Sequence, residues 1–152
     1  MGKDYLYRGF TGEGDVKGNI VFCGYGVDMP DSGYTDYNTD VKGKIVMMFK
    51  QTPLWMKEKL KIGDLYPRDK ARYAKNKGAK AIILVSQINV ANPQEPIGSI
   101  MEGKSDFIED IPQLHISFEL ADMLLKGTGY NLSQLQNEID SSAKTVNLSL
   151  NY

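Results

Sequence analysis

The sequence is short of the residues that many hydrolases use for catalysis. Among 152 residues it has one histidine, His115, and one cysteine, Cys23. A zinc site would have to rely on carboxylates, which is uncommon, and a serine or cysteine triad would have to use His115 as its base. The lone cysteine excludes an internal disulfide bond and leaves the redox compartment open. Metal-rich and triad-based hydrolases are therefore not expected within these residues.

A charge bias and long hydrophobic runs are also absent. The 18 basic and 19 acidic side chains give a formal net charge of -1, which offers no electrostatic reason to expect nucleic acid or an anionic membrane as a partner. No apolar run approaches the roughly 20 residues that cross a bilayer. Residues 1–10 (MGKDYLYRGF) lack the apolar segment of a signal peptide. The hydrophobic share of 41% is ordinary for one globular domain with its own core.

Short apolar runs predict the strands. Residues 45–49 (IVMMF) and 81–85 (AIILV) are almost continuously apolar, as in strands that are covered on both faces. Residues 145–150 (TVNLSL) alternate between polar and apolar, which is typical of a half-exposed strand. Residues 19–23 (NIVFC) and 114–117 (LHIS) complete the set.

A helix is predicted after Pro67. Proline at the start, an early aspartate, later basic residues and a closing Gly78 agree with the preferences of helix ends. Ala71, Ala74 and Gly78 form a stripe of small residues along one side. Such a stripe would let the helix lie close against a sheet.

Further helical segments follow the later strands. Residues 118–126 (FELADMLLK) predict a helix with Ser117 as its N-cap and Gly127 as its stop. Residues 132–139 favour another short helix, and residues 50–65 fit either a short helix or an ordered loop.

The order of these elements predicts an α/β protein. Helices that alternate with buried strands imply a parallel portion of sheet. The alternating final strand and the first strand pair suggest an antiparallel portion beside it. We expect two sheets and a layer of helices.

The glycines after the first strand do not match a phosphate-binding loop. A dinucleotide fingerprint needs glycine at 24, 26 and 29, but position 29 is Met29, and the residues that follow run into a loop rather than a helix. The GxxxxGK[ST] motif is absent from the sequence. We interpret Gly24-Tyr25-Gly26 as a tight backbone turn at the end of a strand.

Other polar residues give no better candidate for a metal or catalytic site. A calcium loop would need a closing glutamate, and Lys42 occupies that position. The aspartates considered for calcium are Asp28, Asp31, Asp36 and Asp40. His115 lies between two apolar residues and is expected to be a hydrogen-bonded, half-buried side chain, and Cys23 to face the core. No spacing recommends Glu58, Asp64 or Asp69 as a carboxylate pair, so we predict neither catalytic, metal nor cofactor-binding residues.

Leu54, Trp55 and Met56 form the one candidate interface in the sequence. They lie in a polar connection beside Lys57, where a tryptophan is unexpected. Tryptophan and methionine are common anchors at protein interfaces. The alternative is that Trp55 folds back as a lid over the core of its own domain.

Three groups of segments, in this order, resemble the protease-associated (PA) domain, especially the version inserted in secreted two-zinc aminopeptidases. The first is GDVKGNIVFCGYGV (14–27) and the second is DVKGKIVMMF (40–49) with KARYAKNKGAKAIILVS (70–86). The third is IPQLHISFELADMLL (111–125). The resemblance is carried by the ordered set of segments and not by any one of them.

The resemblance implies a β/β/α sandwich with a partly parallel, partly antiparallel sheet and packed helices. It places a PA domain at residues 14–152 and leaves 1–13 as a linker or leader. The family's domain is regarded as non-catalytic, so no metal or catalytic residue carries over, and zinc is expected only in the catalytic domain of a parent enzyme.

The resemblance also implies partners and a compartment. The domain is expected to cover the active site of a larger zinc-dependent aminopeptidase or carboxypeptidase-type hydrolase, or to bind its substrate or another protein. Its location would be extracellular or periplasmic. The alternative is a free-standing peptide- or protein-binding module of the cell envelope.

Overall fold

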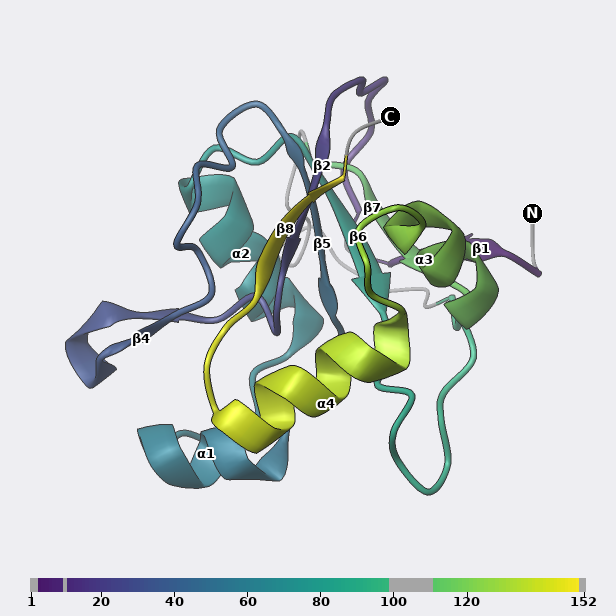
Figure 1. Ribbon diagram of the computed structural model, residues 1–152. Helices are drawn as coiled ribbons and strands as arrows, with labels where there is room; N and C mark the ends of the chain where they lie inside the picture. Colours follow the sequence, from purple (N-terminus) through teal and green to yellow (C-terminus); the bar gives the residue numbers. More distant parts are fainter. Residues whose placement is uncertain (1–2, 10, 99–110, 151–152) are drawn as a thin grey trace.

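A mixed six-stranded sheet forms the centre of the protein (Figure 1). The computed structural model describes residues 3–9, 11–98 and 111–150. In chain order the described elements are β1 (Tyr5–Tyr7), β2 (Ile20–Cys23), β3 (Asp28–Met29), η1 (Pro30–Ser32), β4 (Tyr34–Thr35), β5 (Ile45–Phe49), α1 (Leu54–Leu60), α2 (Pro67–Asn76), β6 (Ala81–Val85), β7 (Gln113–Ile116), α3 (Phe118–Leu125), α4 (Leu132–Ser142) and β8 (Asn147–Leu150).

The order of the strands is β1-β7-β6-β5-β2-β8, and the four central strands are parallel. The edge strands β1 and β8 run antiparallel to β7 and β2. The prediction of an antiparallel first pair is wrong, because β2 and β5 run in parallel with Ile20 opposite Ile45. The connection 24–44 is long enough for the crossover that a parallel pair requires. It carries the second sheet, the β3–β4 ribbon.

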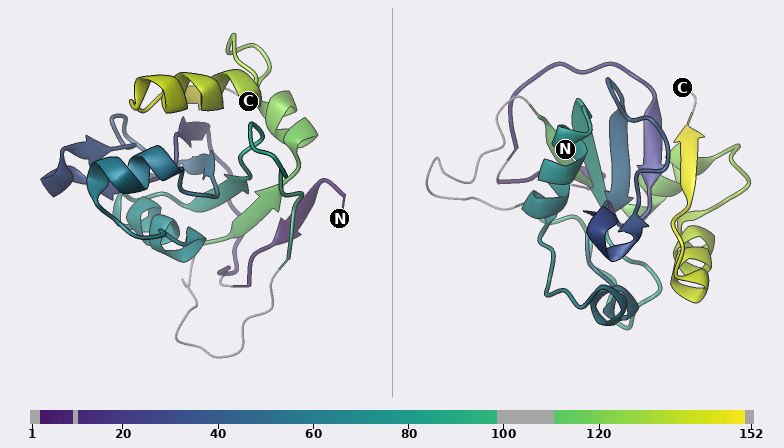
Figure 2. Two further views of the ribbon diagram at one scale, coloured as in Figure 1. Left: turned by 90° about the horizontal axis from the view of Figure 1, so that it is seen from below. Right: turned by 90° about the vertical axis from the view of Figure 1, so that its left-hand side faces the viewer.

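Helices cover both faces of the large sheet. The left view of Figure 2 shows α3 and α4 on one side and α2 on the other. The alternation along β5 explains why both sides are needed: Met47 and Phe49 belong to one buried cluster, and Val46 and Met48 to another. The fold class predicted from the sequence, a partly parallel and partly antiparallel sheet with packed helices, is confirmed.

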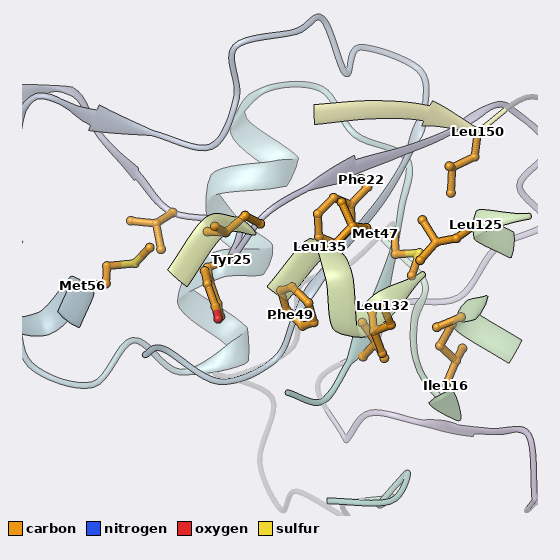
Figure 3. Close-up of a cluster of buried hydrophobic side chains, with 14 of the residues drawn as sticks. Phe22, Tyr25, Met47, Phe49, Met56, Ile116, Leu125, Leu132, Leu135 and Leu150 are labelled. Atoms are coloured by element: carbon orange, nitrogen blue, oxygen red, sulfur yellow. The ribbon is translucent and has the colours of Figure 1, made fainter. Parts of the chain in front are cut away.

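The larger cluster lies under α1, α3 and α4 (Figure 3). Phe22 and Phe49 meet edge to face with ring centroids 5.5 Å apart, and Tyr25 lies against Phe49 at 5.1 Å. Leu132 and Leu135 of α4 are fully buried against this cluster. Aromatic pairs of this kind stabilise a core beyond the effect of their buried area.

The helix α2 uses the predicted stripe to cover the opposite face. Ala71 and Ala74 are both fully buried in the second cluster. The helix ends before Gly78, whose φ of 87° allows the chain to turn directly into β6. At its start, the amide of Tyr66 donates to the Asp69 carboxylate at 3.0 Å.

The N-terminal segment is part of the sheet. Tyr5 pairs with Ile116 and Tyr7 with Leu114 in β1. Thr11 continues the attachment, because its hydroxyl accepts from the amide of Gln113 at 2.7 Å. The predicted linker 1–13 therefore contains an edge strand, which three residues with weak alternation did not reveal. None of the helices within the described ranges is long and apolar enough to span a membrane.

Candidate functional site at the carboxyl ends of the parallel strands

Ligands of open α/β sheets bind outside the carboxyl ends of the strands. In this protein the turns after β2, β5 and β6 lie at that edge, and each presents backbone N–H or C=O groups. Whether the edge can hold a phosphate, a cofactor or a substrate depends on what those backbone groups already bind.

After β2, the side chain of Asp36 occupies the turn at Gly24-Tyr25-Gly26. The amides of Tyr25 and Val27 donate to Asp36 Oδ2 at 3.1 and 3.0 Å, and the Tyr34 hydroxyl donates to Oδ1 at 2.9 Å. Asp36 is fully buried, and this burial raises the pKa of its carboxyl. The turn does bind an anion, and that anion is a carboxylate of the same chain.

The glycines of this turn are required by its packing. Gly24 has a φ of 47° and Gly26 a φ of 67°, a region that favours glycine. A Cβ on Gly24 would overlap the Asp36 carboxylate, and one on Gly26 would overlap the sulfur of Met48. The sequence interpretation of a tight turn at a strand end is confirmed.

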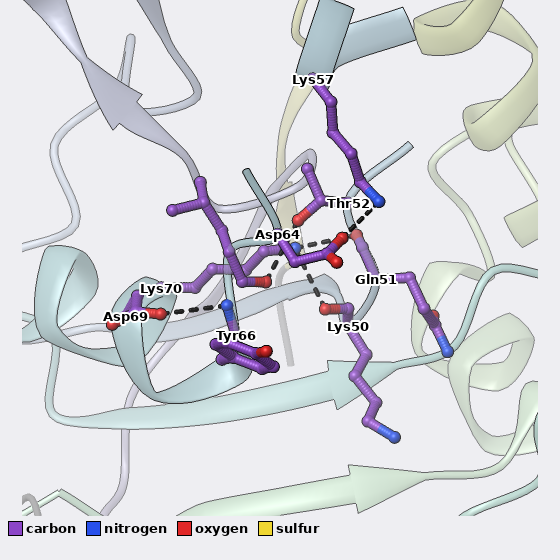
Figure 4. A network of polar contacts seen from close by, with 9 residues as sticks. Lys50, Gln51, Thr52, Lys57, Asp64, Tyr66, Asp69 and Lys70 are labelled. Carbon is purple, nitrogen blue, oxygen red and sulfur yellow. Dashed lines mark hydrogen bonds and ion pairs between the residues drawn. The ribbon is translucent and has the colours of Figure 1, made fainter. Parts of the chain in front are cut away.

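After β5, the ammonium group of Lys70 occupies the turn (Figure 4). Its Nζ donates to the carbonyl oxygens of Phe49, Lys50 and Gln51 at 3.2, 3.1 and 2.8 Å. It also lies 5.7 Å from the centre of the Tyr25 ring. Burial lowers the pKa of Lys70 to about 7, and the negative charge of Asp36 opposes the shift.

After β6, two glutamines bind the backbone. Gln51 Oε1 accepts from the amide of Gln87 at 2.9 Å. Gln136 of α4 accepts from the amides of Ile88 and Asn89 at 2.8 and 2.9 Å. All three turns are thus bound by internal side chains, and the position at which a nucleotide phosphate would bind is filled.

His115 has a hydrogen-bonding pattern unsuited to a general base. Its Nδ1 accepts from the amide of Ile97 at 3.1 Å, so the proton of the neutral ring lies on Nε2, which donates to Ser86 Oγ at 2.9 Å. A serine triad needs the opposite arrangement, with Nε2 accepting the serine proton. Burial lowers the pKa of His115 to about 4, so the ring is neutral at pH 7. The predicted hydrogen-bonded role is confirmed, although the side chain is fully rather than half buried.

The remaining titratable candidates are dispersed. Cys23 is fully buried, and burial raises the pKa of its thiol to about 12. Asp28 pairs with Lys77 at 3.0 Å, and Asp64 forms an ion pair with Lys57. Within the described part of the chain, no three histidine, cysteine or acidic side chains are grouped so as to hold a metal ion.

The predicted interface residues have three different environments. Leu54 is 68% exposed. Trp55 is partly buried, donates from Nε1 to Asp140 Oδ1 at 2.8 Å, and meets Tyr25 and Tyr34 edge to face. Met56 is fully buried in the core (Figure 3), so it is not available to a partner.

A cleft opens beside α1 at the same edge of the sheet. It has a volume of about 390 Å³ and includes the 58%-exposed Tyr66. Its lining combines amides, lysines and apolar groups from Lys50, Gln51, Thr52, Lys57, Asp64, Leu65, Tyr66, Pro67 and Gln87. Leu54 on α1 and this cleft are thus exposed features beside the strand ends.

These features define a small α/β domain whose strand ends are filled by its own side chains. A model of the family described as "PA domain" matches residues 24–124. The chain therefore belongs to the PA, or protease-associated, domain family.

The fold is shared with solved structures, and no curated protein matches this chain. An aminopeptidase from Aneurinibacillus sp. strain AM-1 aligns with a TM-score of 0.54 and 21% sequence identity. The alignment covers 85% of this chain and 26% of that chain. This chain therefore corresponds to about a quarter of the length of that aminopeptidase.

Proposed function

We propose that this chain is a non-catalytic PA domain that acts as part of a larger zinc-dependent aminopeptidase or carboxypeptidase-type hydrolase. The observation that carries the proposal is the filling of the strand ends by Asp36, Lys70 and Gln51. A domain whose usual ligand-binding edge is occupied internally is suited to covering, positioning or docking rather than to chemistry. Membership of the PA family and the fold shared with an aminopeptidase support the same direction.

The partner in this proposal is a catalytic peptidase domain, and the contact surface is the exposed side of α1 with the adjacent cleft. Leu54 is the central candidate because it is large, apolar and 68% exposed. Trp55, the next residue, attaches α1 to α4 through its hydrogen bond to Asp140 and so holds the surface in place. The compartment we propose is extracellular or periplasmic.

Two measurements test the proposal. The 152-residue chain, assayed alone on aminoacyl and peptide substrates with and without zinc, should show no turnover; zinc-dependent hydrolysis would overturn it. Mass spectrometry of the protein from its native source should give a product longer than this chain. A mature product of 152 residues would favour the free-standing binding module instead.

A matched pair of substitutions tests the surface. Leu54→Glu in the longer protein should weaken peptidase activity or domain docking while leaving the melting of this domain unchanged, because the side chain is exposed. Lys61→Gln, beyond the other end of α1, is the control, because it changes the net charge in the same direction and by the same amount. Equal effects of both variants would remove Leu54 from the interface.

A further inference from the structure

The three acceptors around Lys70 need a fully protonated amine. A neutral amine has two N–H bonds, whereas an ammonium has three donors. Lys70 Nζ lies 2.8 to 3.2 Å from three carbonyl oxygens and is fully enclosed. Loss of one proton therefore leaves one of these carbonyls facing a lone pair, in a place that bulk water does not reach.

The charged surroundings of Lys70 are unusually simple. Asp36 is the carboxylate whose charge favours the ammonium. Lys50 contributes its carbonyl but directs its own Nζ to Gln94. Lys57 and Asp64, which face the same turn from α1 and from the α1–α2 connection, are paired with each other (Figure 4).

Two further charges on α2 are also held locally. Asp69 binds the amide of Tyr66 and lies 3.6 Å from the guanidinium of Arg72. Within the described ranges, therefore, no second carboxylate is placed to hold the proton on Lys70 if Asp36 does not.

The three carbonyls belong to the turn that leads into α1. Phe49 ends β5, Gln51 lies two residues before Pro53, and α1 begins at Leu54. Trp55 is fixed on its other side by Asp140 of α4 and by the rings of Tyr25 and Tyr34. Trp55 is the second residue of α1, so a displacement of the turn would move the backbone that carries the indole relative to these partners.

We infer that Lys70 is a proton-controlled positioning residue: its ammonium form fixes the turn 49–53 and hence the start of α1, and loss of the proton releases both. This device is independent of the proposed peptidase partner. Its consequence is that the exposed surface at Leu54 and Trp55 has two arrangements, selected by pH.

The burial of Lys70 determines the pH range in which it loses its proton. Because burial lowers the pKa of this amine to about 7, the two forms exchange near neutral pH rather than near the usual value for lysine. The pKa of His115 is lowered to about 4, so the histidine does not titrate in this range. Burial lowers the pKa of Lys50 to about 8, so Lys50 needs its own control.

Trp55 is the sole tryptophan in the sequence, so its fluorescence reports directly on the start of α1. Emission of the 152-residue chain should change sigmoidally with a midpoint near pH 7. Lys70→Met, whose unbranched side chain is one atom shorter and has no charge, should show a flat profile. Lys50→Met should retain the wild-type midpoint.

Two results would overturn the inference: a flat fluorescence profile in the wild type, or an unchanged transition in Lys70→Met. If Lys70→Met does not fold, carbon-13 labelling of lysine Cε in the wild type replaces it. The Lys70 signal and the Trp55 fluorescence must then titrate with the same midpoint, and different midpoints would contradict the coupling.

Discussion

At the scale of single residues, the most consequential group is the Asp36 carboxylate. It accepts from two backbone amides and one tyrosine hydroxyl while fully buried. Asp36→Ala leaves three donors without their partner, and each unsatisfied buried group costs about 1 to 3 kcal/mol. We therefore expect a loss of several kcal/mol in urea denaturation. Asp31→Ala, on an exposed side chain of the same connection, should lie close to wild type; an equally small effect at Asp36 would contradict the assignment.

His115 predicts a defined pH dependence of stability. The pKa is about 4 in the folded protein against 6.5 for an unperturbed ring, so the unfolded chain binds more protons between these values. Stability contributed by the neutral ring is complete above pH 6.5 and is lost as the pH falls toward 4. The loss approaches about 3 kcal/mol.

The His115 prediction is measured as a difference. Urea denaturation of wild type and His115→Gln at several pH values cancels the contributions of carboxylates that titrate in the same range. The two curves should converge as the pH falls, because the variant lacks the titrating ring. Parallel curves would show that His115 is not held neutral.

The roles of some single residues can be predicted from the sequence, and those of others cannot. The buried role of His115 follows from its apolar neighbours, and the turn at Gly24 follows from the failed phosphate motif. The roles of Asp36 and Lys70 do not, because the backbone groups that they bind are 9 to 21 positions away. In the sequence, Asp36 is one of several loop aspartates, and Lys70 is one of several basic residues suited to a helix dipole.

At the scale of elements, the small-residue stripe of α2 is open to test. Ala71 and Ala74 are fully buried between the helix and the sheet. Ala71→Leu or Ala74→Leu should overpack this contact and lower the free energy of unfolding by about 1 to 3 kcal/mol. Arg72→Leu, on the exposed side of the same helix, is the matched control. Variants as stable as wild type would mean that this face is not packed.

Trp55 and Leu54 give an opposed pair of expectations on α1. Trp55→Ala removes two edge-to-face ring contacts and the bond to Asp140, and should destabilise the isolated chain by about 3 kcal/mol. Leu54→Ala should change stability by less than about 0.5 kcal/mol, since the side chain is exposed. Thermal melting of both variants measures this. If Trp55→Ala hardly changes the stability, Trp55 is not needed by its own core and would again be a candidate interface anchor.

The elements that sequence patterns predict are those with a strong period or a clear end signal. Ser117 caps α3, its hydroxyl accepting from Leu120 at 3.2 Å, as expected from its place before an apolar run. The ambiguous segment 50–65 contains α1, and residues 132–139 form most of α4. The strands β3 and β4 have two residues each, and β1 has three. Such short strands leave no period to detect.

At the scale of the whole molecule, the direction in which strands pair is harder to predict from the sequence than the position of each strand. The antiparallel final strand follows from its alternation, and β8 does pair that way with β2. The sequence predicts the wrong direction for the first pair, β2 and β5, because a long polar connection does not reveal at which end of the sheet the chain re-enters it. The order of the elements predicts the α/β class, and the family resemblance implies the same mixed sheet with packed helices.

The thermal stability of the chain should not depend on zinc. The reason is that its one cysteine, Cys23, and its one histidine, His115, are not available as ligands. Zinc sites in proteins are usually built with cysteine thiolates or histidine nitrogens, and sites made of carboxylates alone are uncommon. The Cys23 thiol is buried with its pKa raised to about 12, and both nitrogens of His115 are engaged by Ile97 and Ser86. We therefore expect the same melting temperature in EDTA, in buffer and in a molar excess of zinc chloride. A known zinc protein of similar size, unfolded by EDTA, is the positive control. Stabilisation by zinc that survives Cys23→Ala and His115→Gln would point to carboxylate ligands, and would contradict the prediction that this domain binds no metal.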